Sequence, residues 1–410
     1  MKLHILLVNA VADALADIFQ NGKYADKVIE RLLKSNSKWG SRDRAFIAET
    51  TYECVRWLRM YDALSPSPAR NDQEFDVMNY TKDDFIQLIG VHLVLKAGEN
   101  IDFPLFKNLD YTELYKRSEA LSDRKVKNAI PNWLDSLGEK ELGNQLWEAE
   151  LFALNKPAQI VLRCNTLKTT VSDVQKKLND INIDAETTPL SIDALVLKKR
   201  AHVASTELYK KGYFEVQDAG SQLIAPFLQV EGGMYVIDAC AGTGGKSLHL
   251  AALMNNSGTL IAMDTEGHKL EELRKRAQRN SINIIETRTI ESPKVISRFH
   301  NTADGLLLDV PCSGLGVLRR NPDTKWKLKP EFLDIIRATQ AQIIQNYSKM
   351  VKIGGKMVYA TCSILPSENQ NQVATFLDNN RNWKMEEDKT ITAHADGFDG
   401  FYMTRLKRLS

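Results

Sequence analysis

Two cysteines of this 410-residue chain directly follow runs of apolar residues. Cys312 stands in "GLLLDVPCSG" and Cys362 stands in "GKMVYATCS". A buried free cysteine usually acts as a small hydrophobe, and we expect this of Cys54 and Cys164. A thiol at the end of a strand, however, can lie near a helix N-terminus or a ligand, where its pKa falls and the thiolate becomes a nucleophile. Cys312 and Cys362 are therefore both candidate nucleophiles.

A carboxylate and a basic segment accompany Cys312. Asp309 stands three residues before it, and a carboxylate there can bond the exocyclic amine or ring nitrogen of a pyrimidine. Residues 316–330 hold five Lys or Arg side chains, one acid and a tryptophan, which is typical of a loop that binds phosphates and stacks on a base. The alternative is a solvated loop whose tryptophan anchors it to the core. The candidates for nucleic-acid contact are Arg319, Arg320, Lys325 and Trp326.

A glycine-rich stretch, "DACAGTGGKS" at 238–247, separates an apolar run from a helical pattern. Such a turn lets a ligand approach the backbone and the helix N-terminus, and Asp264, 22 residues after Gly242, is spaced to bond a ribose. A Walker A loop would need a glycine where Cys240 stands, and a dinucleotide fingerprint would need one at Ser247. Adenosyl-methionine, with one adenosine and one amino-acid tail, tolerates this shorter loop, and a turn without a ligand is the remaining alternative. The loop candidates are Cys240, Ala241, Gly242, Thr243, Gly244, Gly245 and Lys246.

The pattern of elements that must position these residues predicts an α/β fold. Across residues 231–410, apolar strand-like runs alternate with amphipathic helical patterns, which argues for a doubly wound, Rossmann-like parallel sheet. Both cysteines then lie at the carboxyl ends of strands, where such sheets bind ligands. Residues 126–230 are expected to hold a linker and a small α+β module. Residues 1–125 read as an all-helical domain.

The composition limits the class of protein. Lys and Arg number 54 against 52 Asp and Glu, so a net charge of +2 leaves any nucleic-acid binding to local basic patches. Five dispersed cysteines without C-x-x-C spacing argue against a disulfide framework or a zinc site, and favour a reducing compartment such as the cytoplasm. Asp13 and Asp17 interrupt the apolar start, and we expect a core-facing helix there rather than a signal peptide. No stretch approaches the ~20 apolar residues of a membrane span.

Together these motifs resemble the Sun/RsmB family of RNA (cytosine-5) methyltransferases. "PNWLDSLG" and "VLRCNTLK" are similar to the RNA-contacting module that precedes the family's catalytic domain, and the first 125 residues resemble the helical NusB-like region of its ribosomal-RNA subgroup. The resemblance implies S-adenosyl-L-methionine as the cofactor and RNA, from the small ribosomal subunit, as the substrate. The catalytic-domain matches are "FEVQDAGSQL", "DACAGTGGKS", "MDTEGHKLEELRKR", "DVPCSGLGVLRRNPDTKW", "YATCSILPSENQNQV" and "ADGFDGFYMTRLKR".

The resemblance also implies a role for each thiol. In this family the cysteine of the Thr-Cys motif, here Cys362, attacks the base, and the Pro-Cys cysteine, here Cys312, helps to release the product. DNA cytosine-5 enzymes use the Pro-Cys residue instead, so the presence of Cys362 favours RNA. Asp309 and Lys246 complete the expected catalytic set.

For the cofactor, the resemblance implies contacts from the glycine-rich loop, Asp264 and Asp309. Where the family usually has an Asp after its third strand, residues 282–295 offer only Thr289 and Glu291, and Thr289 stands as the candidate there. We expect a monomer that acts without a metal or a membrane. Two alternatives stay open, which are the same chemistry on transfer RNA and a non-catalytic RNA-binding factor of ribosome assembly.

Overall fold

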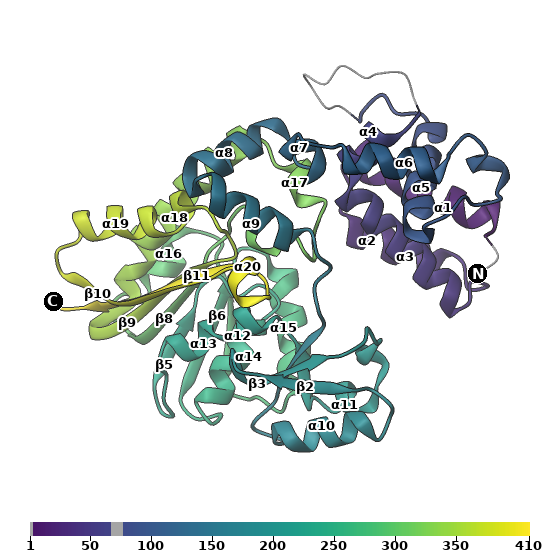
Figure 1. Ribbon diagram of the computed structural model, residues 1–410. Coiled ribbons are helices and arrows are strands. Elements are labelled where there is room, and N and C mark those ends of the chain that lie inside the picture. Colours follow the sequence, from purple (N-terminus) through teal and green to yellow (C-terminus); the bar gives the residue numbers. More distant parts are fainter. Residues whose placement is uncertain (1–2, 67–76) are drawn as a thin grey trace. The chain divides into compact units, whose positions relative to one another are not determined.

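The computed structural model describes residues 3–66 and 77–410, which fall into two compact units (Figure 1). One unit holds Met1–Asn155 together with Leu318–Pro330, and the other holds Lys156–Val317 and Glu331–Ser410. A short segment of the C-terminal half of the chain therefore belongs to the N-terminal unit. The boundary at Asn155 lies within the range that we expected to hold the linker and the module.

The first unit is helical because its sequence places apolar residues at helical spacing. Helix α1 (Ile5–Phe19) buries Leu7, Ala10, Ala14 and Ile18, so the core-facing helix predicted at the N-terminus is confirmed, although Leu6 points to solvent. Cys54 is buried in this core, as expected. The other helices are α2 (Ala25–Ser35), α3 (Ser41–Arg56), α4 (Leu58–Leu64), α5 (Lys82–Ala97), α6 (Tyr111–Glu119), α7 (Arg124–Lys127), α8 (Asn132–Leu142), α9 (Asn144–Leu154) and α17 (Thr324–Lys327), with a 3-10 turn at Pro104–Phe106.

The second unit begins with a small α+β module. Its antiparallel sheet has the strand order β2-β3-β1-β4, and helix α10 (Val171–Asn179) packs on it through Val174 and Leu178. Cys164 is buried in the same core. The remaining elements are β1 (Val161–Cys164), β2 (Ala185–Thr188), β3 (Ser191–Leu197), β4 (Phe214–Val216) and α11 (Glu207–Lys210).

A seven-stranded sheet with the order β10-β11-β9-β8-β5-β6-β7 forms the rest of this unit. The predicted parallel arrangement holds for β5 to β9, whereas β11 runs antiparallel to both of its neighbours, β9 and β10, and makes the sheet mixed. The strands are β5 (Tyr235–Asp238), β6 (Thr259–Asp264), β7 (Ile285–Thr289), β8 (Ala303–Asp309), β9 (Val351–Thr361), β10 (Trp383–Ile391) and β11 (Phe401–Arg408).

Helices cover both faces of this sheet (Figure 1). Successive side chains of a strand point to opposite faces, so Val236 joins one apolar core and Ile237 joins the other. The first face is covered by α13 (Ile224–Phe227), α14 (Gly245–Leu253) and α15 (Gly267–Arg279), and the second by α16 (Pro293–Ser297), α18 (Pro330–Tyr347) and α19 (Gln370–Asn379). Two further short helices are α12 (Ala219–Gln222) and α20 (Ala393–Asp396).

The order of the strands reverses at β5, which pairs with β6 on one side and with β8 on the other. The carboxyl ends of parallel strands meet at one edge, and a crevice opens where the order reverses. The glycine-rich stretch and both candidate thiols follow strands at this edge. Within the described part of the chain, no helix combines the length and the apolar character that crossing a bilayer requires.

Candidate active site

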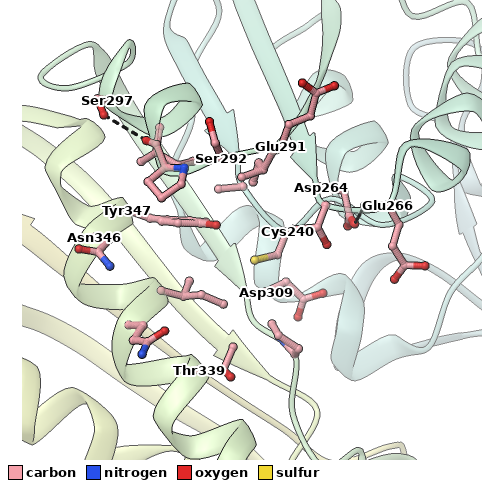
Figure 2. Close-up of a pocket in the computed structure, with 18 of the residues that line it drawn as sticks. Cys240, Asp264, Glu266, Glu291, Ser292, Ser297, Asp309, Thr339, Asn346 and Tyr347 are labelled. Carbon is pink, nitrogen blue, oxygen red and sulfur yellow. Dashed lines mark hydrogen bonds between the residues drawn. The ribbon is translucent and has the colours of Figure 1, made fainter.

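A cavity of about 790 Å³ opens at the carboxyl ends of the parallel strands, a volume within the range of roughly 300–1,000 Å³ that small-molecule sites have. Cys240 and Gly242 after β5, Asp264 of β6 and Asp309 of β8 line one wall. Figure 2 shows Cys240, Asp264 and Asp309 across the cavity from helix α18, which contributes Thr339, Asn346 and Tyr347. The structure therefore brings the predicted carboxylates and part of the glycine-rich loop to one cavity.

The glycine-rich loop needs glycine at Gly244, the residue that precedes helix α14. Its φ of +88° is a left-handed conformation, and a Cβ atom there would lie 2.4 Å from the Cγ atom of Leu273. Gly242 also has a positive φ of +52°, and a Cβ on it would meet none of the described atoms within 4 Å. Close packing thus fixes Gly244, while Gly242 leaves open space at the cavity wall.

The carboxylate of Asp264 is held by two backbone N–H groups. Gly242 N donates to Oδ2 at 2.8 Å, and Glu266 N donates to Oδ1 at 2.9 Å. Each carboxylate oxygen keeps further acceptor capacity, which a pair of ribose hydroxyls can use. An anchored carboxylate beside an open glycine backbone, in a cavity of this volume, fits an adenosine-containing cofactor.

Lys246 and Asp309 form an ion pair in which Nζ lies 2.5 Å from Oδ2. The two side chains are only 14% and 27% exposed. Burial alone would lower the pKa of Lys246, but Asp309 outweighs it, and the pKa is raised above its ordinary value of 10.5. Lys246 therefore keeps its charge and orients the Asp309 carboxylate at the rim.

The two candidate thiols lie side by side, with 3.2 Å between their Sγ atoms. They follow β8 and β9, which are neighbouring strands paired at Asp309 and Ala360. Gly316 lets the two loops approach, because its N–H donates to the Cys362 carbonyl and a Cβ on it would lie 2.8 Å from the same carbonyl oxygen. The hydrogen bond with Cys362, followed by burial, raises the pKa of Cys312 well above its usual range. Cys312 is therefore expected to stay a thiol and to donate toward Cys362.

Sequence reasoning missed Glu368, which is fully buried beneath the thiols. Its Oε2 atom accepts from Ser313 N at 2.8 Å and from Gln340 Nε2 at 3.0 Å, and its Oε1 atom accepts from Ser363 Oγ at 2.5 Å. The only signal in the sequence is an acid shortly after the Thr-Cys motif, in "CSILPSEN".

Asp238, at the end of β5, was also passed over although it begins the glycine-rich stretch. Its side chain is fully buried, and its Oδ2 atom accepts from Ser247 Oγ at 2.6 Å. Burial, only partly opposed by the Ser247 hydrogen bond, raises the pKa of Asp238 to about 7. An uncharged carboxyl group can therefore exist in this core near neutral pH.

The contact predicted at Thr289 lies elsewhere. Among the described residues, the cavity wall after β7 is made by Ile290, Glu291 and Ser292, and the Thr289 side chain lies beside Gly267 instead. Side chains alternate along an extended strand, so Ile290 points to the face opposite Thr289 and reaches the cavity, and Glu291 and Ser292 line it from beyond the strand end. Glu291 is thus the acid at this wall, opposite Tyr347 (Figure 2).

The basic segment after Cys312 differs from the solvent-facing loop that we expected. Lys325 is 2% exposed, and its Nζ atom donates to the Arg56 carbonyl at 2.9 Å and to Asn155 Oδ1 at 3.1 Å. Trp326 donates from Nε1 to the Val55 carbonyl and packs on the helical core. For Lys325 and Trp326 the alternative, an anchoring role, fits the structure better, because a buried charged or polar group must find partners inside the protein. Arg319 is buried as well, at 8% exposure, while Arg320 is half-buried.

The small α+β module is tied directly to the glycine-rich loop. Arg276 of helix α15 donates to the carbonyl and hydroxyl oxygens of Thr243, and it pairs with Glu215 of strand β4 at 2.9 Å. Arg163 of strand β1 donates to the Gly245 carbonyl at 2.6 Å. Neither connection was visible in the sequence, since the residues that meet are more than thirty positions apart.

Two parts of the chain match known protein families. Residues 225–407 match the protein family described as 16S rRNA methyltransferase RsmB/F, and residues 130–204 match a ferredoxin-like domain described as RsmF/B-like. The chain is 29% identical to the probable ribosomal RNA small subunit methyltransferase B of Synechocystis, over 96% of this chain and 97% of that one. It is 32% identical to the ribosomal RNA small subunit methyltransferase B of Shewanella oneidensis, over 72% of this chain and 69% of that one.

Solved structures support the same fold. The crystal structure of PH0851 superposes with a TM-score of 0.80 at 21% identity and covers the whole of both chains. The structure of NSun6 from Pyrococcus horikoshii with SFG gives a TM-score of 0.64 at 18% identity, over 69% of this chain and 99% of that one. At these identities the structural matches show the fold alone, whereas the sequence relatives show the family.

Proposed function

The chain belongs to the RsmB/F family of 16S rRNA methyltransferases, and from this membership and the geometry of its site we propose a role for each residue of an RNA cytosine-5 methyltransferase. Cys362 is the nucleophile, and Cys312 helps to release the product. The observation that carries this assignment is the 3.2 Å separation of the two sulfur atoms, at the sheet edge that also holds the Lys246–Asp309 pair.

The cofactor of this family is S-adenosyl-L-methionine, which supplies an electrophilic methyl group when it is bound. Cys240, Gly242, Asp264 and Asp309 line the cavity that would hold it, and the Asp264 carboxylate would bond the ribose. Lys246 acts through the orientation that it imposes on Asp309. Glu291, rather than Thr289, is the acid available at the wall after β7.

The reaction begins with addition of the Cys362 sulfur to C6 of the target cytosine, which must be unstacked to enter the site. Addition breaks the C5–C6 double bond and makes C5 electron-rich, while the Asp309 carboxylate accepts a hydrogen bond from the exocyclic amine or from the protonated ring nitrogen. After C5 has gained the methyl group, a base takes the C5 proton, the electrons of that C–H bond restore the C5–C6 double bond, and the Cys362 sulfur leaves as a thiolate with the electrons of the C6–S bond. The Cys312 thiol, 3.2 Å away, stabilises the departing thiolate by donating its S–H hydrogen.

Contact with RNA outside the site is proposed for Arg320, which is half-buried, whereas Arg319, at 8% exposure, is too buried to meet a phosphate directly. Lys325 and Trp326 serve to anchor their segment in the helical unit. We further propose that the enzyme works as a monomer, which is supported by the fact that one chain supplies both thiols, both carboxylates and the cofactor cavity. We propose the cytoplasm as its compartment, because its five cysteines are free thiols and a reducing compartment keeps them so.

Transfer of labelled methyl groups to unmodified 16S rRNA, followed by sequencing of the modified RNA, tests the proposal. We expect incorporation with the native chain and none with Cys362→Ala. We expect Cys312→Ala to accumulate an RNA–protein adduct that survives denaturation. Full activity of Cys362→Ala would refute the assignment of the nucleophile, and labelling of transfer RNA instead would favour the alternative substrate. Absence of any transfer by the native chain would favour the non-catalytic assembly factor.

A further inference from the structure

We propose that Glu368 is a positioning residue that fixes the Cys312 thiol against Cys362, and that release of the methylated RNA depends on it. This inference rests on the roles proposed above for the two cysteines. Glu368 touches neither thiol through a hydrogen bond of its own, and it acts through the residue that follows each of them.

Glu368 joins the two cysteine loops from below. Its Oε2 atom accepts from the backbone N–H of Ser313, directly after Cys312, at 2.8 Å. Its Oε1 atom accepts from the hydroxyl of Ser363, directly after Cys362, at 2.5 Å. The two serine hydroxyls also bond each other at 3.1 Å. One carboxylate therefore acts as a clamp that holds each loop at the residue directly after its cysteine. This clamp sets the distance between the two sulfur atoms.

The clamp is itself held rigidly. The Glu368 carbonyl accepts from the Tyr359 hydroxyl at 2.7 Å, so its backbone is fixed to strand β9. Gln340 of helix α18 donates to Oε2 at 3.0 Å and bonds the Pro311 carbonyl at the same distance. The clamp thus connects the strand, the helix and the segment before Cys312.

Burying a carboxylate costs free energy unless it is well satisfied, and a neutral residue would usually stabilise a core better. Glu368 is fully buried, and its partners are a backbone N–H, a hydroxyl and an amide rather than a Lys or Arg side chain. A buried carboxylate without an ion pair does little for the stability of the fold. The position of Glu368 between the two cysteine loops explains it better. Its negative charge also contributes to raising the pKa of Cys312, which keeps that group protonated for donation.

The test compares adduct formation and turnover in four variants of the full chain. Cys312→Ala is the positive control for trapping. Glu368→Ala releases the Cys312 loop, and we expect an adduct that survives denaturation to accumulate and turnover to fall roughly 10–100-fold, as for a misplacement of about 1 Å. Glu368→Gln can accept from Ser313 and donate to Ser363, so it should restore release. Arg405→Ala is the matched control, because it removes ion pairs to Glu386 and Glu387 at the β10–β11 edge of the same sheet.

A structural role alone would lower activity without trapping RNA, which separates the two explanations. The inference is overturned if folded Glu368→Ala, with cofactor binding retained, shows no more adduct than Arg405→Ala. If Glu368→Ala does not fold, Ser363→Ala decides, because it removes only one arm of the clamp and should still trap a fraction of the RNA. If Cys312→Ala itself traps nothing, the proposed roles of the thiols fail, and that outcome is distinct from a failure of Glu368 alone.

Discussion

Asn in place of Asp238 should change how the stability of the protein depends on pH. The pKa of this carboxyl group is raised from its ordinary value of 3.8 to about 7, chiefly by burial. The nearby Asp309 also raises the pKa, whereas the Ser247 hydrogen bond and Lys246 lower it. In the range between these two pKa values the folded chain binds a proton that the unfolded chain has lost. Stability therefore falls as pH rises through this range, because ionisation is easier in the unfolded state.

The magnitude follows from the two pKa values. The linkage relation gives a loss of about 2–3 kcal/mol between about pH 5 and pH 8 for a group with these values. For a unit of this size, about 1 kcal/mol corresponds to roughly 2–4 °C in melting temperature. Asp238→Asn cannot ionise, so the melting temperature of the variant minus that of the native chain should increase by roughly 5–10 °C from pH 5 to pH 8.

The assay is thermal unfolding of both chains at a series of pH values, without cofactor. Using the difference between the chains cancels the titration of other groups and the constant cost of burying the amide. Asp304→Asn is the control, since burial would raise the pKa of Asp304 but Lys352 and the Tyr235 N–H outweigh it and lower the pKa. Its difference curve should therefore not rise over the same range. A flat difference curve for Asp238→Asn would refute the reasoning.

Three further outcomes are expected. Arg276→Ala removes two hydrogen bonds to Thr243 of the glycine-rich loop, so the cofactor should bind roughly 5–100-fold more weakly in an equilibrium titration. An unchanged Kd would show that Arg276 does not hold this loop for cofactor binding. Lys325→Ala should cost the helical unit about 1–3 kcal/mol in chemical denaturation, yet leave the salt dependence of RNA binding unchanged. Arg320→Ala, in contrast, should reduce the slope of log K against log salt by about 1, and a slope equal to that of the native chain would remove Arg320 from the RNA surface.

The residues that could be predicted from the sequence are those placed by strand ends. Cys312, Cys362, Asp264 and Asp309 each follow or close an apolar run, and a parallel sheet brings the carboxyl ends of its strands to one edge whatever the loops do. The same logic located the glycine-rich turn. These strands could be recognised in the sequence because burial on both faces makes each of them a continuous apolar run.

Residues whose role depends on a distant partner could not be predicted. The charge and spacing of Lys325 are those of a phosphate-binding loop, and only the carbonyl of Arg56, 269 positions earlier, reveals that it is buried. Glu368 reads as an ordinary polar residue at a helix start until the two cysteine loops close over it. Asp238 shows no sign of its raised pKa in the sequence, because burial is a property of the folded core.

The segment Leu318–Pro330 has a consequence for biosynthesis. It supplies Lys325 and Trp326 to the helical unit, although all of Lys156–Val317 must be translated first. At about 5–20 residues per second, the ribosome takes roughly 10–30 s to reach it after completing the N-terminal helices. Throughout this time the nascent helices expose the apolar surface that Trp326 later covers. The helical unit therefore cannot complete its folding before Pro330 has been translated, although its helices are synthesised first.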